Sequence, residues 1–150
     1  MNLDWRRSRR RGAGPWTLLL ACLLLAQAAL ADSAPNLDVP VSTVRSNRGV
    51  VFVALYDQRN WLKPGRFLTA RKVPARRGTV VARFRGVRPG RYGVAVFHDE
   101  NSNGRVDKNF VGLPAEGFGF SRTTPRRVPR FSETSFPLHR PATQPVRLRY

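Results

Sequence analysis

The sequence predicts an all-β protein, an antiparallel β-sandwich of the Ig-like or transthyretin-like type, preceded by an N-terminal signal peptide helix. From Gly49 onwards, short runs of β-branched and aromatic residues alternate with turn residues. No segment after residue 31 has a sustained helical period, and most of the 12 prolines fall in this part of the chain. Roughly five to seven short strands separated by turn signals are typical of such sandwiches.

Residues 1–31 have the pattern of a signal peptide. A basic segment, Arg6–Arg11, precedes an apolar run from Trp16 to Ala26, and Ala29-Leu30-Ala31 has the small-x-small form of a cleavage site. We therefore expect cleavage before Asp32, a periplasmic or secreted protein, and no membrane span after cleavage. The apolar run is shorter than the ~18–20 residues that cross a bilayer as a helix, which disfavours a retained anchor.

Other export routes are less consistent with the leader. Leu19-Leu20-Ala21-Cys22 loosely resembles a lipoprotein box, but the chain stays apolar after Cys22. The paired arginines indicate twin-arginine export only weakly. Because Cys22 is the single cysteine, the cleaved chain has no thiol and forms neither a disulfide nor a thiolate metal site.

The mature chain is strongly basic. The leader contains five arginines and one aspartate, which leaves 22 basic and 8 acidic residues and a net charge of +14. Such a charge favours anionic partners, here an anionic envelope polymer, whereas export argues against nucleic acid. The excess of arginine over lysine also fits a compositional bias spread over solvated faces.

The first strands are expected after a linker. Residues 32–48 are polar, contain Pro35 and Pro40, and are expected to form a linker or arm before a domain at 49–150. Val50–Tyr56 is apolar at nearly every position and predicts a buried strand. A loop over 57–66 and a weaker strand or turn over 67–73 follow, because the first of these is rich in Asp, Asn, Pro and Gly.

The next two strands are predicted to form a hairpin. Thr79–Phe84 and Arg91–Phe97 flank Pro89-Gly90, a pair that suits a type II turn. Further strands are expected at Thr134–Leu138 and at Pro145–Tyr150, where apolar residues alternate with arginines as in a half-exposed strand that closes the sheet.

The segment after Phe97 has the spacing of a calcium-binding loop. Alternate residues of a tight loop direct oxygens to one centre, Gly104 permits the turn, and hard oxygen ligands suit Ca²⁺. An EF-hand loop has a bidentate Glu at its twelfth position, and here the twelfth residue counted from Asp99 is Phe110. We therefore expect a carboxylate from farther along the chain to complete the site. The predicted metal-ligating residues are Asp99, Asn101, Asn103, Arg105 through its backbone carbonyl, Asp107 and Glu116. The alternative is an ordinary turn in which Asp and Asn bind their own backbone.

A longer pattern around this loop resembles the bacterial DUF2141 family, from about Gly49 to the C-terminus. The residues that carry the resemblance are Gly90-Arg91-Tyr92, Phe97-His98-Asp99-x-Asn101-x-Asn103-Gly104-x-x-Asp107-x-Asn109-Phe110-x-Gly112-x-Pro114-x-Glu116-Gly117-Phe118-Gly119-Phe120-Ser121, Val53–Asp57 and Pro129-x-Phe131-x-Glu133-x-Ser135-Phe136. The chain departs from the pattern at Arg122, where the family has Asn. The resemblance implies export and a β fold, and it implies no activity.

Catalytic constellations are weak. Ser121, His98 and Asp99 contain the groups of a triad, but His98 and Asp99 are neighbours in a strand and point to opposite faces. Glu116 with Asp107 or Asp99 is a conceivable acid–base pair of a small hydrolase. His98 is expected either beside the loop site or, more simply, at the rim of the core.

Aromatic residues offer one further candidate. Phe118 and Phe120, with Phe110 and Phe131, are expected to pack over the loop rather than to form a glycan platform, and Trp61 is the aromatic candidate for ligand contact. The sequence thus favours an exported, non-catalytic structural or interaction module with a calcium-type loop and an unidentified protein partner. The alternatives are a protein that binds an anionic envelope polymer through its arginines and a small hydrolase.

Overall fold

The computed structural model describes residues 34–105, 116–124 and 127–150. These residues are mostly strands, in two sheets rich in antiparallel pairs, and the helix described is the four-residue α2 (Phe131–Thr134). The all-β prediction is confirmed. The predicted signal peptide, together with Asp107 and Phe110, lies outside the described residues.

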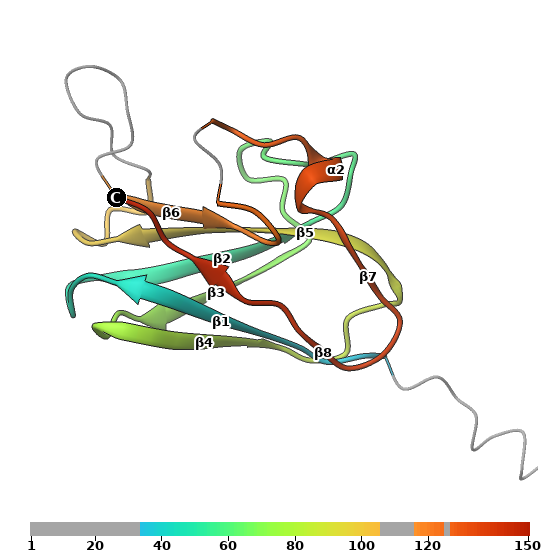
Figure 1. The fold of residues 1–150 in the computed structure, drawn as a ribbon, viewed down its shortest axis with the longest axis horizontal. Helices are drawn as coiled ribbons and strands as arrows, with labels where there is room; N and C mark the ends of the chain where they lie inside the picture. The colour runs from blue at the N-terminus through green and yellow to red at the C-terminus, as the bar shows by residue number, and fades with distance from the viewer. Residues whose placement is uncertain (1–33, 106–115, 125–126) are drawn as a thin grey trace, which may run out of the picture. The chain divides into compact units, whose positions relative to one another are not determined.

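The first sheet is built around one central strand (Figure 1). The strand β1 (Leu37–Val44) pairs antiparallel with β4 (Gly78–Phe84) on one side. On its other side it pairs in parallel with two short strands, β8 (Ala142–Thr143) and β9 (Val146–Arg147). The C-terminal segment is therefore part of this sheet.

The second sheet has the order β3-β2-β5-β6, and β7 also pairs with β5. All of the strand pairs described in this sheet are antiparallel. Its strands are β2 (Val50–Tyr56), β3 (Thr69–Pro74), β5 (Gly90–Asp99), β6 (Gly117–Phe120) and β7 (Phe136–Leu138). The buried strand predicted at Val50–Tyr56 is thus confirmed.

The expected linker over 32–48 is wrong for residues 37–44, which form β1. Leu37, Val39 and Val41 have no exposed surface and belong to the core that both sheets share. The polar residues that alternate with them lie on the other face of the strand, as the two-residue period of a strand requires. The domain accordingly begins before residue 49.

Pro40 fits this strand because of its neighbours. The Asp38 carbonyl accepts from Gln144 N–H (2.9 Å) and the Ser42 carbonyl accepts from Leu148 N–H (3.1 Å). The backbone N–H and C=O groups of even-numbered residues in β1 therefore point along the sheet towards the C-terminal segment. Pro40 shares this alternation and faces the break between β8, which ends at Thr143, and β9, which begins at Val146. A missing donor interrupts no ladder bond at that point.

The predicted hairpin of Thr79–Phe84 and Arg91–Phe97 is also wrong. β4 pairs with β1, whereas β5 pairs with β2, so the two strands belong to different sheets. The connection between them crosses from one sheet to the other, and Val87 N–H donates to the Pro35 carbonyl at 2.9 Å on the way. Turn residues specify that the chain reverses, but they do not specify which strand it then pairs with.

The C-terminal predictions are partly correct. The strand expected at Thr134–Leu138 is instead the end of α2 followed by β7. In the last segment Val146 and Leu148 are buried in the core while Arg147 and Arg149 are exposed, as the alternation predicted. No helix of the described residues is long and apolar enough to span a membrane.

The strands define two ends of the domain. At the end that we call the loop end, Asp99 at the close of β5 pairs with Val50 at the start of β2. At the opposite end, Tyr56 at the close of β2 pairs with Gly93 near the start of β5. The C-terminus lies at the loop end, beside β6 (Figure 1).

Candidate functional site

The predicted calcium loop begins with a buried carboxylate at the loop end. Asp99 is 2% exposed. Its Oδ1 accepts a hydrogen bond from Asn103 N–H at 3.0 Å and its Oδ2 accepts one from Gly104 N–H at 2.8 Å. Within the described part of the chain, no basic side chain forms an ion pair with it. Backbone dipoles therefore solvate this carboxylate.

The two asparagines shape the same turn. Asn101 Oδ1 accepts from Asn103 N–H at 3.1 Å, and Asn103 Oδ1 accepts from Arg105 N–H at 2.8 Å. Ser102 and Gly104 have positive φ angles of 60° and 75°. These are the bonds expected of successive Asx turns.

The carboxylate predicted to complete the site returns to the base of the loop. Glu116 is 5% exposed, and its Oε1 accepts from Glu100 N–H at 2.9 Å. The structure therefore brings Glu116 next to the residue that follows Asp99. Asp107 lies outside the described residues, and among those described no group of three or more His, Cys, Asp or Glu side chains is placed to hold a metal. The predicted ligand set depends on amide and backbone oxygens as well.

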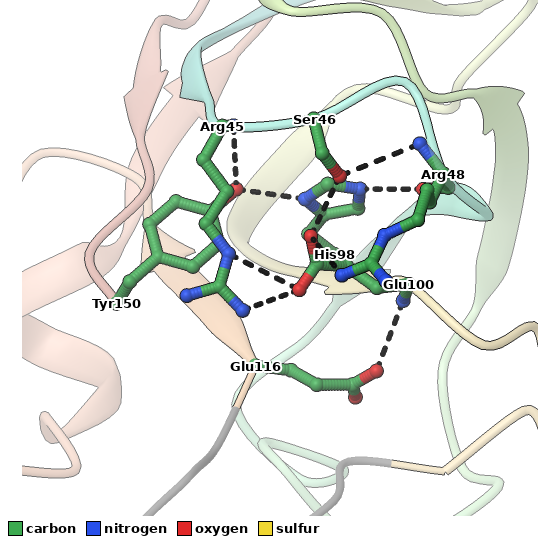
Figure 2. Close-up of polar contacts among 7 residues, drawn as sticks. All are labelled: Arg45, Ser46, Arg48, His98, Glu100, Glu116 and Tyr150. Carbon is green, nitrogen blue, oxygen red and sulfur yellow. Dashed lines mark hydrogen bonds and ion pairs between the residues drawn. The ribbon is translucent and has the colours of Figure 1, made fainter.

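Both stems of the loop are joined to a polar cluster in which the sequence predicted the place of Glu116 and His98 but not their partners. We call Arg45, Ser46, Arg48, His98, Glu100, Glu116 and Tyr150 the loop-base cluster (Figure 2). The Glu100 carboxylate contacts Arg45, accepts from Ser46 Oγ at 2.6 Å and lies 3.7 Å from Arg48 Nη2. Its hydrogen bond to Arg45 is the largest influence that lowers the Glu100 pKa from 4.5 to about 2.

His98 and Tyr150 form the second half of this cluster (Figure 2). His98 is fully buried, with Nε2 2.8 Å from the Arg48 carbonyl and Nδ1 2.7 Å from the Tyr150 hydroxyl. The Arg48 carbonyl can only accept, so Nε2 carries the hydrogen, and in the neutral imidazole Nδ1 then accepts from Tyr150. Burial raises the pKa of Tyr150, and its hydroxyl in turn accepts from Arg45 N–H at 3.0 Å. Every group in this chain of hydrogen bonds has a partner of the right kind.

Two glycines allow these close approaches. At Gly49, with a φ of 68°, an added Cβ would lie 1.9 Å from the Asp99 carbonyl oxygen. At Gly117 it would lie 2.4 Å from the Tyr150 ring. Larger residues at either position would push apart the segments that join at the loop base.

A comparison with known families decides the relationship that the loop pattern indicated. The family described as "Uncharacterized protein conserved in bacteria (DUF2141)" matches residues 39–145. The chain belongs to this family. The DUF2141 match begins inside β1, which agrees with β1 being part of the domain, and it includes both stems of the loop. Tyr150 lies outside the matched residues. No curated protein and no solved structure matches the chain significantly.

The groups considered for catalysis in this DUF2141 domain have separate partners. Ser121 Oγ donates to the Thr134 carbonyl at 2.7 Å and accepts from Val94 N–H at 2.9 Å. His98 binds Tyr150 and Arg48, and Asp99 binds its own loop. The side chains of Ser121, His98 and Asp99 therefore do not form a catalytic triad. Glu116 lies near the start of the loop, while its other suggested partner, Asp107, is not described.

The predicted packing over the loop is wrong for Phe120 and Phe131, which lie with Trp61 at the opposite end, and Phe110 lies outside the described residues. Trp61 packs with its ring centroid 5.6 Å from Tyr56, 6.0 Å from Phe120 and 5.8 Å from Phe131. Its Nε1 donates to the Pro129 carbonyl at 2.9 Å. The indole of the DUF2141 domain therefore packs within an aromatic cluster and joins the turn 57–66 to the segment before α2.

The sequence carried few signals for the loop-base cluster. Arg45, Ser46 and Arg48 lie in the segment for which the sequence predicts a linker, and Tyr150 is 105 residues from Arg45 in the chain. For Tyr150 the usable signal was its alternation with Val146 and Leu148, which predicts that Tyr150 points to the same side as two core residues. Its partner could not be deduced from that pattern.

Proposed function

We propose that this chain is an exported, non-catalytic β-sandwich of the Ig-like or transthyretin-like type, periplasmic or secreted, whose Asp99–Asp107 loop binds Ca²⁺. The ion orders the loop, and the ordered loop serves a structural or interaction role with a protein partner. The observation that carries this proposal is the buried Asp99 carboxylate, which backbone N–H groups solvate and with which no arginine pairs among the described residues.

The distribution of arginines supports this proposal. A buried carboxylate is costly unless a counter-charge or several donors compensate it. In this basic domain Arg45 and Arg48 both pair with Glu100, the adjacent residue. Among the described residues, Asp99 has two backbone donors, and a carboxylate has about four lone-pair positions. A divalent cation is the compensation that suits its remaining capacity.

The ligands for such an ion would come from both stems of the loop. Asp99, Asn101, Asn103, the Arg105 carbonyl and Asp107 are the candidates in the loop, and Glu116 is the candidate from the returning strand. All are hard oxygen donors, which Ca²⁺ prefers and softer transition metals do not. The loop-base cluster fixes the two stems, so that less conformational freedom is lost on binding.

Calorimetry with the isosteric variant Asp99→Asn tests the proposal. We expect the wild-type protein to bind Ca²⁺ with a Kd of roughly 10⁻⁴–10⁻³ M, the range of extracellular calcium modules, and to melt at a higher temperature with calcium. Asp99→Asn should weaken binding at least about tenfold because it removes the buried charge.

The matched control is Asp57→Asn. Asp57 also accepts a backbone hydrogen bond in a turn, from Asn60 N–H at 2.9 Å, but it lies at the opposite end. This variant should bind calcium as the wild type does. If wild-type protein gives no heat and no rise in melting temperature at millimolar calcium, the loop is an ordinary Asx turn and the proposal is wrong.

A second candidate function rests on the exposed arginines. The side chains of Arg48, Arg83, Arg85 and Arg127 are 59–75% exposed. A protein that binds an anionic envelope polymer through such residues would lose affinity steeply as salt rises and would keep it in the presence of a chelator. Binding that tolerates salt and is abolished by the chelator would favour the calcium-ordered module instead.

A further inference from the structure

A cleft of about 340 Å³ opens at the opposite end of the domain, far along β5 from Asp99. It lies where β3, an edge strand of one sheet, faces β4, an edge strand of the other. Edge strands of different sheets share no hydrogen-bond ladder, so side chains alone close the space between them. The volume lies within the ~300–1,000 Å³ typical of small-molecule sites.

The floor of the cleft is apolar. It contains Leu55, which has no exposed surface, Phe84, which is 1% exposed, and Tyr92, which is 8% exposed. Leu68 lines the cleft nearer its mouth and is 49% exposed. The Tyr92 hydroxyl donates to the Arg88 carbonyl at 2.7 Å, so the polar atom of this ring is satisfied by protein. Above this buried floor, Leu68 and the partly buried Val87 supply accessible apolar surface, and an apolar group that enters the cleft displaces water from it.

Three arginines, Arg71, Arg85 and Arg88, line the same cleft. Arg71 is fixed in place, because its Nη1 donates to the Ala70 carbonyl at 2.9 Å, its Nε donates to the Arg83 carbonyl at 3.2 Å, and its guanidinium lies 5.4 Å from the Phe84 ring centroid. Arg85 Nη1 is 3.5 Å from Asp38 Oδ1. The Arg88 side chain makes no hydrogen bond or ion pair with any described residue.

We propose that this cleft binds a small amphiphilic anion. Its acyl or aromatic part contacts Leu68, Val87 and the accessible edge of Tyr92, and its carboxylate or phosphate pairs with Arg88 and with the arginines beside it. The cleft favours an anionic head group because few acidic side chains neutralise its arginines. Among the described residues, Asp38 is the one acidic group paired with a cleft arginine, and its arginine partners are Arg85 and Arg83. The site does not depend on the calcium loop, which lies at the other end of the domain.

Three probes with matched chemistry test the proposal by calorimetry on the whole protein. Decanoate has both the tail and the anionic head, decyltrimethylammonium has the same tail with the opposite charge, and acetate has the head without the tail. We expect one saturable site for decanoate and at least about tenfold weaker binding of the other two. Equal binding of the cationic amphiphile, or equal binding of acetate, overturns the proposal.

Two arginine variants test whether decanoate binds in this cleft. Arg88→Gln removes one charge-assisted hydrogen bond and should weaken decanoate binding about tenfold. The matched control is Arg76→Gln, an exposed arginine in the β3–β4 connection at the loop end, and it should leave decanoate binding unchanged. If both variants weaken binding equally, general surface charge is responsible and the cleft is not the site.

Nuclear magnetic resonance gives an independent readout. Decanoate should shift the backbone amide signals of Leu68, Val87 and Tyr92, which line the cleft, and should leave those of the loop end in place. Shifts confined to other residues contradict the proposal. If Arg88→Gln alters binding to phosphatidylglycerol vesicles but not to decanoate, the cleft recognises a membrane surface and the assignment to a soluble amphiphile is wrong.

Discussion

At the scale of single residues, the loop end depends on pairs of side chains that are far apart in the sequence. Glu100 contacts Arg45, His98 contacts both Arg48 and Tyr150, and the Tyr150 hydroxyl connects the two groups through Arg45 N–H. Because His98 is fully buried, each of its ring nitrogens needs a protein partner. Tyr150 supplies one of these partners from the last position of the chain.

The first prediction concerns this hydroxyl. Tyr150→Phe leaves His98 Nδ1 and Arg45 N–H without the partner that joins them, and we expect the free energy of unfolding to fall by about 1–3 kcal/mol. Denaturant unfolding measures the change. Tyr56→Phe is the matched control, because the Tyr56 hydroxyl makes no hydrogen bond with the described residues, and it should cost less than about 0.5 kcal/mol. Equal effects of the two variants would show that the Tyr150 hydroxyl contributes nothing specific.

At the scale of elements, the central strand of the first sheet is the one that sequence reasoning missed. Leu37, Val39 and Val41 have the two-residue period of a strand, but Asp38, Pro40 and Ser42 between them give the segment the composition of a linker. Composition averages over both faces of a strand, whereas burial depends on one face only. Strands such as Val50–Tyr56, which are apolar on both faces, were identified without this difficulty.

A core substitution in β1 distinguishes a strand from an arm. Leu37→Ala removes a fully buried side chain and should lower the free energy of unfolding by about 2–5 kcal/mol. Val128→Ala, at a position that is 70% exposed, is the control and should cost less than about 0.5 kcal/mol. Thermal and denaturant unfolding of both variants measure this. If Leu37→Ala is as neutral as the control, residues 37–44 do not belong to the core.

At the scale of the whole molecule, the two ends of the domain hold their charged groups differently. At the loop end, Asp99 and Glu116 are buried and the Glu100 carboxylate is paired with two arginines. At the opposite end three arginines line the cleft, and the Arg88 side chain forms no ion pair with a described residue. Strand ends and connections place these side chains, and the shared core between the sheets holds the two ends apart.

The free energy of unfolding should fall as the pH is lowered from 4.5 towards 2. The pKa of Glu100 is about 2 in the folded protein, against an ordinary value of 4.5, mainly through its hydrogen bond with Arg45. A lowered carboxylate pKa stabilises the fold above pH 4.5, and this contribution is lost as pH falls from 4.5 towards 2. The lost contribution is at most about 3 kcal/mol. Glu133, whose pKa is also lowered, adds to the change in the same direction.

Urea unfolding between pH 6 and pH 2 tests this dependence, with Glu100→Gln as the variant that lacks the titrating group. The variant should be less stable than the wild type at pH 6, and the difference should shrink as the pH approaches 2. Asp38→Asn is the control and should leave the difference small at every pH, because Asp38 is a partly exposed carboxylate whose arginine contacts are 3.5 Å and 3.8 Å long. A constant difference between wild type and Glu100→Gln across this range contradicts the role assigned to Glu100.

Local patterns were sufficient for the all-β class, for the strand at Val50–Tyr56, for the family and for the oxygen-rich turn that starts at Asp99. Each of these depends on residues close together in the sequence, where period, turn chemistry and spacing act directly. The pairing of β4 with β1 rather than β5, the position of β1 and the loop-base cluster depended on contacts between distant segments. Packing both sheets against one core selects these partners, because burial of all apolar faces at once is a property of the folded chain and not of any segment of it.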